Sequence, residues 1–485
     1  FVLKMNTSVD VVVDSSADSA ENKHDNLVLP LKRPRPRRVS LQNISYNDQV
    51  EGEKSTLKPR RIALTKLSSV QKHDSSGIDK LQKDTEETSI SSSNNNKSKL
   101  ELAIERLEEE ESLKTKPRTR DVVYTKVPRF VLSEIGSNKS AMAFFRENGF
   151  VVYGNVLSED QNKKALELMW DYLEGLDSGI VRNKPETYTD ERWPPEIEGG
   201  ILPWLGIGQS KMQWYLRSCH GVQLAFADLW NCECKDLVTS FDGICVFRED
   251  RTPRELRFHV DQNPERSIGF ECIQGLVNLL PTSRESGGNT VIPKSHLEYF
   301  EKLKIKYPEE VKGLEGEDHF EIPINDSYLE EARHDQRCVV SELKAGDMLL
   351  WDSRTIHRNS TSLDMLASIS DANTTTQYPC TGDGGIIEEH EDQKLKQAFV
   401  PCLGLKRIVS FVCMVPKAKL SSEIIEKRKL AVNQNITTSH WPTQLIDTRC
   451  YGSWEMCMKP EVHRFKAPQP PGYDDLTPDQ RRLIG

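Results

Sequence analysis

The sequence has no apolar run that approaches the roughly 20 residues of a membrane-spanning helix. Its first residues contain no hydrophobic stretch of secretory length, so we expect no signal peptide in them. The chain has 11 cysteines, an odd number, and all of them stand at Cys219 or later without the paired spacings of a zinc ribbon. These features favour free thiols in a reducing compartment, and we expect a cytoplasmic or nuclear protein with no membrane span.

An excess of basic residues is also absent. Lys and Arg number 65 against 74 Asp and Glu, which gives a formal net charge of -9 and a pI of about 5.8. This balance argues against a general nucleic-acid-binding protein. One basic cluster runs from Lys32 to Arg38 and is followed by Ser40. It fits a nuclear import signal or a basophilic kinase site, and equally a solvated charge run that no receptor or kinase recognises.

Aromatic residues are scarce in residues 1–125, which consist largely of Ser, Asn, Asp, Lys and Glu. Such a segment cannot bury enough apolar surface to offset the entropy lost on folding. We therefore predict a disordered polar tail over 1–125, one folded domain over 126–450 and a C-terminal extension over 451–485.

The folded part begins with helices and continues with strands. Residues 141–149 predict a helix that stops at Gly149 before a strand ending at Tyr153, and Ser158 caps a second amphipathic helix. Residues 177–215 lack periodicity and fit either a lid or an ordered surface excursion. Short strands are then expected at 240–247, 256–260, 272–280, 289–292, 339–343, 348–351 and 408–415. This order predicts a mainly β protein with flanking helices, built on an antiparallel sandwich or barrel such as a double-stranded β-helix (jelly roll).

Two short motifs predict a metal site. In an extended chain the side chains of His259 and Asp261 leave the same side of the strand. One further histidine would complete a 2-His-1-carboxylate face, which binds Fe(II) and leaves positions open for a cosubstrate and oxygen. His357, after an apolar strand, is our candidate for that ligand. The alternative is a strand-end His259 that is hydrogen-bonded to a neighbour.

At these residues the sequence resembles the phytanoyl-CoA dioxygenase-like family of Fe(II)- and 2-oxoglutarate-dependent oxygenases, and within it a eukaryotic branch. The resemblance covers about residues 140 to 445. It rests on motifs in the family's order: His259-x-Asp261, Gly287-Gly288 to His296, Gly346-Asp347, Trp351 to His357, Arg407 to Pro416 and Thr437 to Pro442.

The resemblance implies Fe(II) as the metal, held by His259, Asp261 and His357, and 2-oxoglutarate as cosubstrate. Arg407 stands where family members bind the distal carboxylate of 2-oxoglutarate, a role that suits the planar guanidinium. Strand alternation lets only one of Lys406 and Arg407 point inward, so Lys406 is the alternative. Asn359 is a further candidate for binding the cosubstrate.

Other polar residues near the motifs are open to two interpretations. Gln274, Asn278 and Asn359 could contact substrate at the mouth of the site, or could be ordinary satisfied amides. Trp351, Asp352 and Arg354 are expected to shape the site, with an internal Asp352–Arg354 pair as the alternative. His296 is expected at a helix start rather than on a metal.

One segment departs from the family pattern. Between His357 and Arg407 lies a polar insertion, about residues 363–403, where most relatives have a short turn. A surface insertion costs little stability, so the following strand can return in register. His390 within it is expected to be a solvated loop residue.

Three hypotheses about function follow. The first is a dioxygenase that hydroxylates a small or lipid-like metabolite, suggested by the ordered motifs. Asp261 favours hydroxylation, because related halogenases replace this carboxylate. The second is a protein- or chromatin-modifying oxygenase, suggested by the basic cluster. The third is a non-catalytic cupin-like binding protein.

Overall fold

The computed structural model describes residues 122–132, 138–197, 199–250, 256–314, 317–361, 402–448 and 465–485. All of them fall in one compact unit, Lys97–Gly485. The basic cluster, nearly all of the tail predicted over 1–125, and most of the 363–403 insertion with His390 lie outside the described residues. No helix among the described residues is both long and apolar enough to cross a bilayer.

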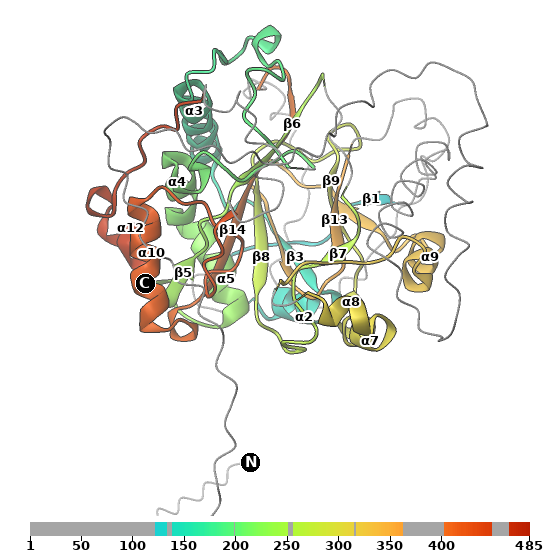
Figure 1. Cartoon of the computed structure of the whole chain (residues 1–485). Coiled ribbons are helices and arrows are strands. Elements are labelled where there is room, and N and C mark those ends of the chain that lie inside the picture. The colour runs from blue at the N-terminus through green and yellow to red at the C-terminus, as the bar shows by residue number, and fades with distance from the viewer. Residues whose placement is uncertain are drawn as a thin grey trace, which may run out of the picture. The chain divides into compact units, whose positions relative to one another are not determined.

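The strands of the central fold lie in two facing sheets (Figure 1). Their bounds are β6 Ile244–Arg248, β7 His259–Val260, β8 Ile273–Asn278, β9 Gly288–Val291, β11 Val339–Ser341, β12 Met348–Asp352, β13 His357–Ser360 and β14 Leu405–Pro416. The first sheet contains the order β11-β9-β13-β7, and the second contains β12-β8-β14-β6. Antiparallel pairing joins neighbours within each of these two sets. This winding is the double-stranded β-helix that the sequence predicts.

Shorter strands extend both sheets at their edges. They are β1 Val123–Thr125 and β10 Phe320–Glu321 in the first sheet, and β2 Arg129–Phe130, β3 Phe150–Tyr153 and β4 Ile201–Leu202 in the second, with β5 Leu237–Thr239 pairing with β14. Strand β1 pairs in parallel with β11 and therefore begins before the domain boundary that we predicted at residue 126.

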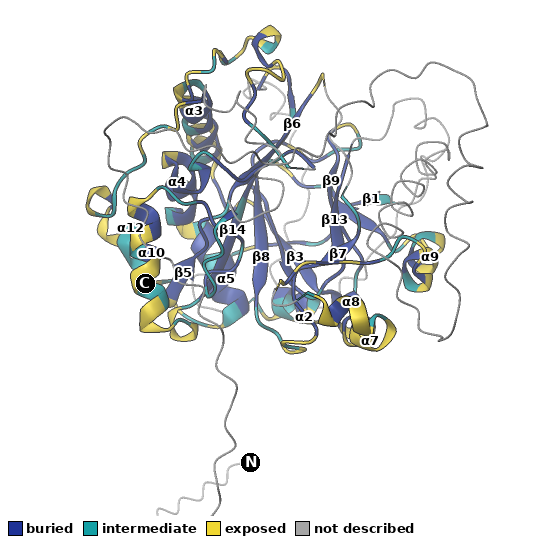
Figure 2. Cartoon of the chain, in the orientation of Figure 1, coloured by how far each residue is buried: buried dark blue, intermediate teal, exposed yellow. Residues whose placement is uncertain are grey.

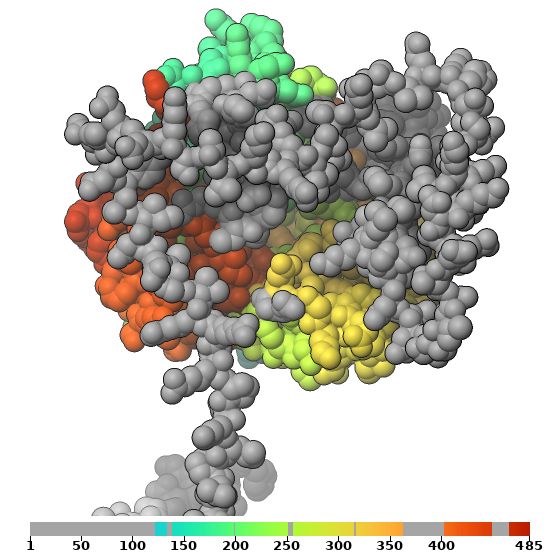
Figure 3. Space-filling view, viewed as in Figure 1, coloured from blue at the N-terminus to red at the C-terminus, as the bar shows by residue number. Residues whose placement is uncertain are grey.

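Helices cover the outer faces of the two sheets. Beside the second sheet lie α2 Lys139–Asn148, α3 Glu159–Gly175, α4 Lys211–Ser218, α5 His220–Trp230, α10 Ser422–Asn433 and α12 Pro478–Arg482. Beside the first sheet lie α6 Ser295–Glu298, α7 Phe300–Lys306, α8 Pro308–Lys312 and α9 Ser327–His334. Single 3-10 turns are η1 Pro185–Thr187, η2 Ile207–Gln209, η3 Cys234–Asp236, η6 Lys417–Lys419 and η9 Tyr473–Asp475. Buried residues concentrate in the sheets and on the inner helix faces (Figure 2). Figure 3 shows the outer surfaces of the C-terminal helices and of the α7 region from the same side.

The first two helices confirm the start and stop signals in the sequence. The Ser158 side chain accepts a hydrogen bond from the Gln161 backbone and forms a capping box at the start of α3. Gly149 ends α2 with a φ of 79°, a left-handed conformation that favours glycine. A β-carbon at Gly149 would lie 2.4 Å from the Thr355 hydroxyl oxygen and 2.5 Å from His296 Nδ1. Glycine therefore lets α2 and β3 approach the loop before His357.

A buried ion pair fixes the turn before β12. Asp347 is fully buried and accepts hydrogen bonds from Arg129 Nη2 at 2.7 Å and Arg129 Nε at 2.9 Å. It also accepts the backbone N–H groups of Asn155 and Lys344, at 3.0 and 2.8 Å. The preceding Gly346 has a φ of +87°. One carboxylate thus ties β2, the end of β3 and the β11–β12 turn together.

Asp347→Ala is expected to lower the free energy of unfolding by about 3–5 kcal/mol, because it leaves the Arg129 charge buried without its partner. Urea denaturation followed by circular dichroism measures this change. Glu426→Ala, which removes an exposed pair with Lys429 on α10, is the control and should change stability by less than about 1 kcal/mol. Equal effects of the two substitutions would contradict the role given to Asp347.

Candidate active site

Three side chains converge at neighbouring ends of β7 and β13. These strands pair antiparallel with His259 directly opposite His357, and Asp261 follows the last residue of β7. Asp261 Oδ2 lies 3.8 Å from His259 Nε2 and 3.3 Å from His357 Nε2. All three residues are buried, and one ligand atom from each lies within 4.8 Å of the others. The residues predicted as metal ligands therefore meet at one point.

The backbone sets both imidazoles in the form that binds metal. His259 Nδ1 lies 2.8 Å from the carbonyl oxygen of Arg257, and His357 Nδ1 lies 2.9 Å from that of Thr355. Because a carbonyl oxygen only accepts, each Nδ1 carries a proton, which leaves Nε2 as the nitrogen that could bind a metal at the shared point. Burial, together with the nearby His357, lowers the pKa of His259 to about 3, so its imidazole is neutral near pH 7.

Asp261 supplies the negative charge of the site. Burial alone would raise the pKa of its carboxyl, but His259, His319 and His357 outweigh burial and lower that pKa well below the usual value. The carboxylate is therefore ionised at neutral pH. Two imidazoles and one carboxylate form the ligand set that suits Fe(II) with open coordination positions.

Both carboxylate oxygens of Asp261 have further partners. Gln274 Nε2 on β8 donates to Oδ2 at 2.8 Å, and His319 Nδ1 lies 3.1 Å from Oδ1. Gln274 therefore holds a candidate ligand, which agrees with the second of its two interpretations, a satisfied amide, rather than with a substrate contact at the mouth. Sequence reasoning missed His319, which precedes the two-residue strand β10.

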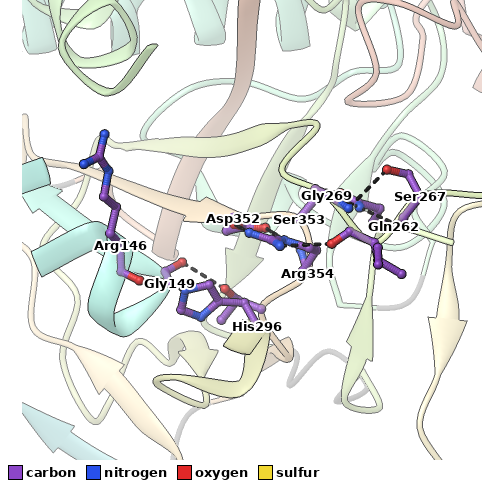
Figure 4. A network of polar contacts seen from close by, with 11 residues as sticks. Arg146, Gly149, Gln262, Ser267, Gly269, His296, Asp352, Ser353 and Arg354 are labelled. Atoms are coloured by element: carbon purple, nitrogen blue, oxygen red, sulfur yellow. Dashed lines mark hydrogen bonds and ion pairs between the residues drawn. The ribbon is translucent and has the colours of Figure 1, made fainter. Parts of the chain in front are cut away.

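The segment Trp351 to His357 holds the chain around Asp261. The Ser353 carbonyl accepts the Asp261 N–H at 3.1 Å, and the Ser353 hydroxyl donates to Gln262 Oε1 at 2.7 Å. Gln262 in turn donates to the backbone carbonyls of the loop that follows β7 (Figure 4). Arg354 pairs with Asp352 at 2.6 Å, the internal pair that we had given as the alternative interpretation. The motif thus locks the backbone on which Asp261 stands.

Three other residues singled out in the sequence do not meet at the metal point. His296 is the second residue of α6, and its Nε2 lies 3.1 Å from the Arg146 carbonyl, which agrees with the expected helix-start position (Figure 4). Asn278 donates to the backbone carbonyls of Leu280 and Lys344 and shapes a turn. The ring of Trp351 lies 5.2 Å from that of His357 and forms a wall beside it.

Arg407 points into the space between the sheets. It lies on β14 opposite Phe247 of β6 and is 1% exposed, whereas Lys406 is only partly buried. Its Nη1 donates to Asn359 Oδ1 at 3.2 Å and lies 3.4 Å from Cys245 Sγ. Burial lowers the pKa of the guanidinium. Among the described residues no carboxylate pairs with Arg407, and its buried Nε has no hydrogen-bond partner. A buried guanidinium without an acidic partner is suited to binding an anionic ligand.

Asn359 contacts Arg407 and lies on the same strand as the candidate metal ligand His357. It stands two residues after His357 on β13, so both side chains leave the same face of the strand. Two residues of a strand span roughly 7 Å. The Arg407 guanidinium therefore lies beside Asn359, the next residue of β13 after His357 whose side chain leaves the same face of the strand.

The irregular segment predicted over 177–215 covers the Arg407 end of this interior. The Gly199 carbonyl accepts from Cys245 Sγ at 3.2 Å and from Asn359 Nδ2 at 3.5 Å. Within the same segment, β4 joins the second sheet beside β6. The described part of the segment is therefore an ordered excursion built into the sheet edge. Cys245 was missed by sequence reasoning, because its apolar neighbours mark it only as a strand residue.

The late motif Thr437 to Pro442 connects the C-terminal part to the site. The Thr437 and Thr438 hydroxyls accept the backbone N–H groups of Gly208 and Phe241, at 3.1 and 3.2 Å. Beyond the motif, Gln444 Nε2 donates to Asp318 at 2.8 Å. A cavity of about 200 Å³ lies there, lined by Gln262, Asn263, Arg266, Ser267, Glu271, Asp318, Trp441, Thr443 and Gln444. Trp441 of the motif thus lines this cavity together with Gln262, the neighbour of Asp261 in the sequence.

Comparison with known proteins agrees with this geometry. Residues 211–362 match the family model described as phytanoyl-CoA dioxygenase (PhyH). The match contains His259, Asp261 and His357 and ends before Arg407. Among curated proteins, the Ava biosynthesis cluster protein O of Aspergillus versicolor is 24% identical over 317 residues, which is 62% of this chain and 87% of the relative.

Solved structures show more distant similarity. The epimerase SnoN in complex with Fe3+, alpha ketoglutarate and nogalamycin RO has a TM-score of 0.34 and 15% identity, over 57% of this chain and 83% of its own. A hypothetical protein from Escherichia coli has a TM-score of 0.45 and 14% identity, over 79% of this chain and 89% of its own.

His259→Ala and Asp261→Ala are each expected to abolish stoichiometric binding of Mn(II) or Fe(II) to the full chain. The loss should exceed the roughly 10–100-fold that removal of a residue behind a ligand costs. The electron paramagnetic resonance signal of free Mn(II) measures the binding. The control is His334→Ala on α9, whose side chain is 88% exposed. Wild-type affinity in either ligand variant would contradict the assignment.

Proposed function

We propose that the chain, whose residues 211–362 match the phytanoyl-CoA dioxygenase family model, is an Fe(II)- and 2-oxoglutarate-dependent dioxygenase that hydroxylates a small or lipid-like organic metabolite. One observation carries the proposal. The His259, Asp261 and His357 face and the buried guanidinium of Arg407 share one interior surface and are joined through Asn359. Among the described residues no carboxylate balances the charge of this buried guanidinium, and an anionic cosubstrate would do so.

The three candidate metal ligands and Arg407 would have different roles in the proposed reaction. When bound, Fe(II) and 2-oxoglutarate would supply the oxidising chemistry, in which one atom of O2 goes into the succinate left after loss of CO2 and the other into a C–H bond of the substrate. The Nε2 atoms of His259 and His357 and the Asp261 carboxylate would hold the metal on one face only. Arg407 would neutralise the distal carboxylate through paired hydrogen bonds.

The interior also excludes water from the reacting groups. Phe247, Leu276, Leu349, Trp351 and Val409 are buried between the sheets around the two binding points. In these apolar surroundings a charge-assisted hydrogen bond to Arg407 is stronger than the same bond in water. The Asp261 carboxylate occupies the position where a halide would have to bind, and this supports hydroxylation over halogenation.

Two observations support a small organic substrate. The curated relative in Aspergillus versicolor is named for a biosynthesis cluster, which fits an enzyme of small-molecule metabolism. Phe411, on the same strand as Arg407, is only partly buried beside the apolar cluster between the sheets. It therefore offers an apolar surface to a substrate near the interior.

The wild-type chain is expected to convert 2-oxoglutarate to succinate with Fe(II), and His259→Ala and Asp261→Ala should reduce the rate to background. Succinate quantified by mass spectrometry measures this, first without added substrate and then with lysate metabolites as candidates. His334→Ala should retain the wild-type rate. Full turnover by a ligand variant would rule out the proposed chemistry.

Arg407→Gln is expected to raise the KM for 2-oxoglutarate by roughly 10- to 100-fold, because one charge-assisted hydrogen-bonded contact contributes about 1.5–3 kcal/mol. Metal affinity measured without cosubstrate should stay at the wild-type value. Lys406→Gln is the matched control, since that neighbouring side chain is only partly buried. An unchanged KM in Arg407→Gln, or a raised KM in Lys406→Gln, would show that the cosubstrate is anchored elsewhere.

A further inference from the structure

Strand β10 extends the metal-ligand face by one more strand. It pairs antiparallel with β7, and Glu321 stands opposite His259. Continuing this register places His319 opposite Asp261. Because alternate side chains leave the same face of a strand, His319 and Glu321 share the face of the two ligands. The result is an array of four polar side chains, of which only two are metal-ligand candidates.

Each nitrogen of the His319 ring faces a different carboxylate of this array. His319 Nδ1 lies 3.1 Å from Asp261 Oδ1, and His319 Nε2 lies 3.7 Å from Glu321 Oε1. The imidazole rings of His319 and His259 are 4.5 Å apart. The other carboxylate oxygen, Asp261 Oδ2, faces His357 Nε2 at 3.3 Å. His319 therefore contacts the oxygen that is turned away from the metal point.

The backbone of His319 is fixed from both sides. Phe320 packs into the apolar cluster beneath the first sheet, together with Phe258 and Val260. The Ile322 N–H donates to the Phe258 carbonyl at 2.9 Å and continues the β7–β10 pairing. On the N-terminal side of His319, the Asp318 carboxylate accepts a hydrogen bond from the side-chain amide of Gln444. The imidazole is about half exposed, so its place depends on this backbone and on its polar contacts.

We infer that His319 is a positioning residue, which donates Nδ1–H to Asp261 Oδ1 and so keeps the carboxylate bound to the metal through Oδ2 alone. This inference rests on the proposed function. A carboxylate that used both oxygens would occupy one more coordination position and leave less room for cosubstrate and oxygen. Gln274 donates to Oδ2, so the two donors together fix the rotation of the carboxylate.

The geometry argues against His319 as a fourth metal ligand. Within the described part of the chain, the set of ligand atoms that lie within 4.8 Å of one another contains only His259, Asp261 and His357. Both ring nitrogens of His319 are directed at carboxylates, those of Asp261 and Glu321.

Three substitutions at His319 test the inference in the full chain, with Mn(II) alone as the probe. The Asn side chain places its amide N–H close to the position of imidazole Nδ1, whereas the Gln side chain extends further, toward the position of Nε2. His319→Ala is expected to weaken Mn(II) binding by about 10-fold or more. His319→Asn should restore most of that loss and His319→Gln should not. Thermal unfolding of the metal-free variants checks that each one folds.

The second readout is the bound Mn(II) spectrum when 2-oxoglutarate is added. The wild type and His319→Asn should show the same spectral change, and His319→Ala a smaller one, because its free carboxylate competes for the coordination position. Wild-type affinity and spectrum in His319→Ala would overturn the inference and leave the proposed function intact. Equal losses in His319→Asn and His319→Ala would also overturn it, because the imidazole itself would then be required. A wild-type chain that binds no Mn(II) would remove the proposed function and this inference with it.

Discussion

The site depends on the pairing of β7 with β13. Their antiparallel register sets His259 directly opposite His357, and a shift of one residue would turn one imidazole to the other face of the sheet. The pairing is central in the first sheet, since β13 also pairs with β9 over four positions and β7 pairs with β10. Neighbours on both sides thus fix the register of two short strands that could not hold it alone.

Around this pairing the protein limits the freedom of one carboxylate. Asp261 lies just beyond the end of β7. Its backbone N–H is held by the Ser353 carbonyl, and its oxygens are held by Gln274 and His319. These partners come from three separate parts of the chain. The cost of a buried charge is thereby met by hydrogen bonds before any metal binds.

Much of this arrangement could be predicted from the sequence, because it depends on local spacing. The two-residue period of a strand places His259 and Asp261 on one side, and the same period separates Arg407 from Lys406. Gly149 marks the end of α2 and Ser158 marks the start of α3. The short apolar runs between turns predict an antiparallel sandwich, and the order of motifs identifies His357.

Other features could not be predicted, because they depend on contacts between distant segments. Strand β10 has two residues, and only its register with β7 shows that His319 meets Asp261. Gln274 differs from an ordinary core amide only through its partner. Cys245 and Gly199 approach Arg407 because β4 joins the sheet edge, and no periodic pattern in residues 177–215 indicates that strand. Register between distant segments is set by tertiary packing and leaves little trace in local sequence.

The most direct test of the account is anomalous X-ray diffraction at the iron edge from crystals grown without oxygen in the presence of Fe(II) and 2-oxoglutarate. The account predicts one iron peak bound by Nε2 of His259, Nε2 of His357 and a single oxygen of Asp261, with the distal carboxylate of 2-oxoglutarate on Arg407. An iron peak away from these three residues, or a 2-oxoglutarate molecule that does not contact Arg407, would contradict it.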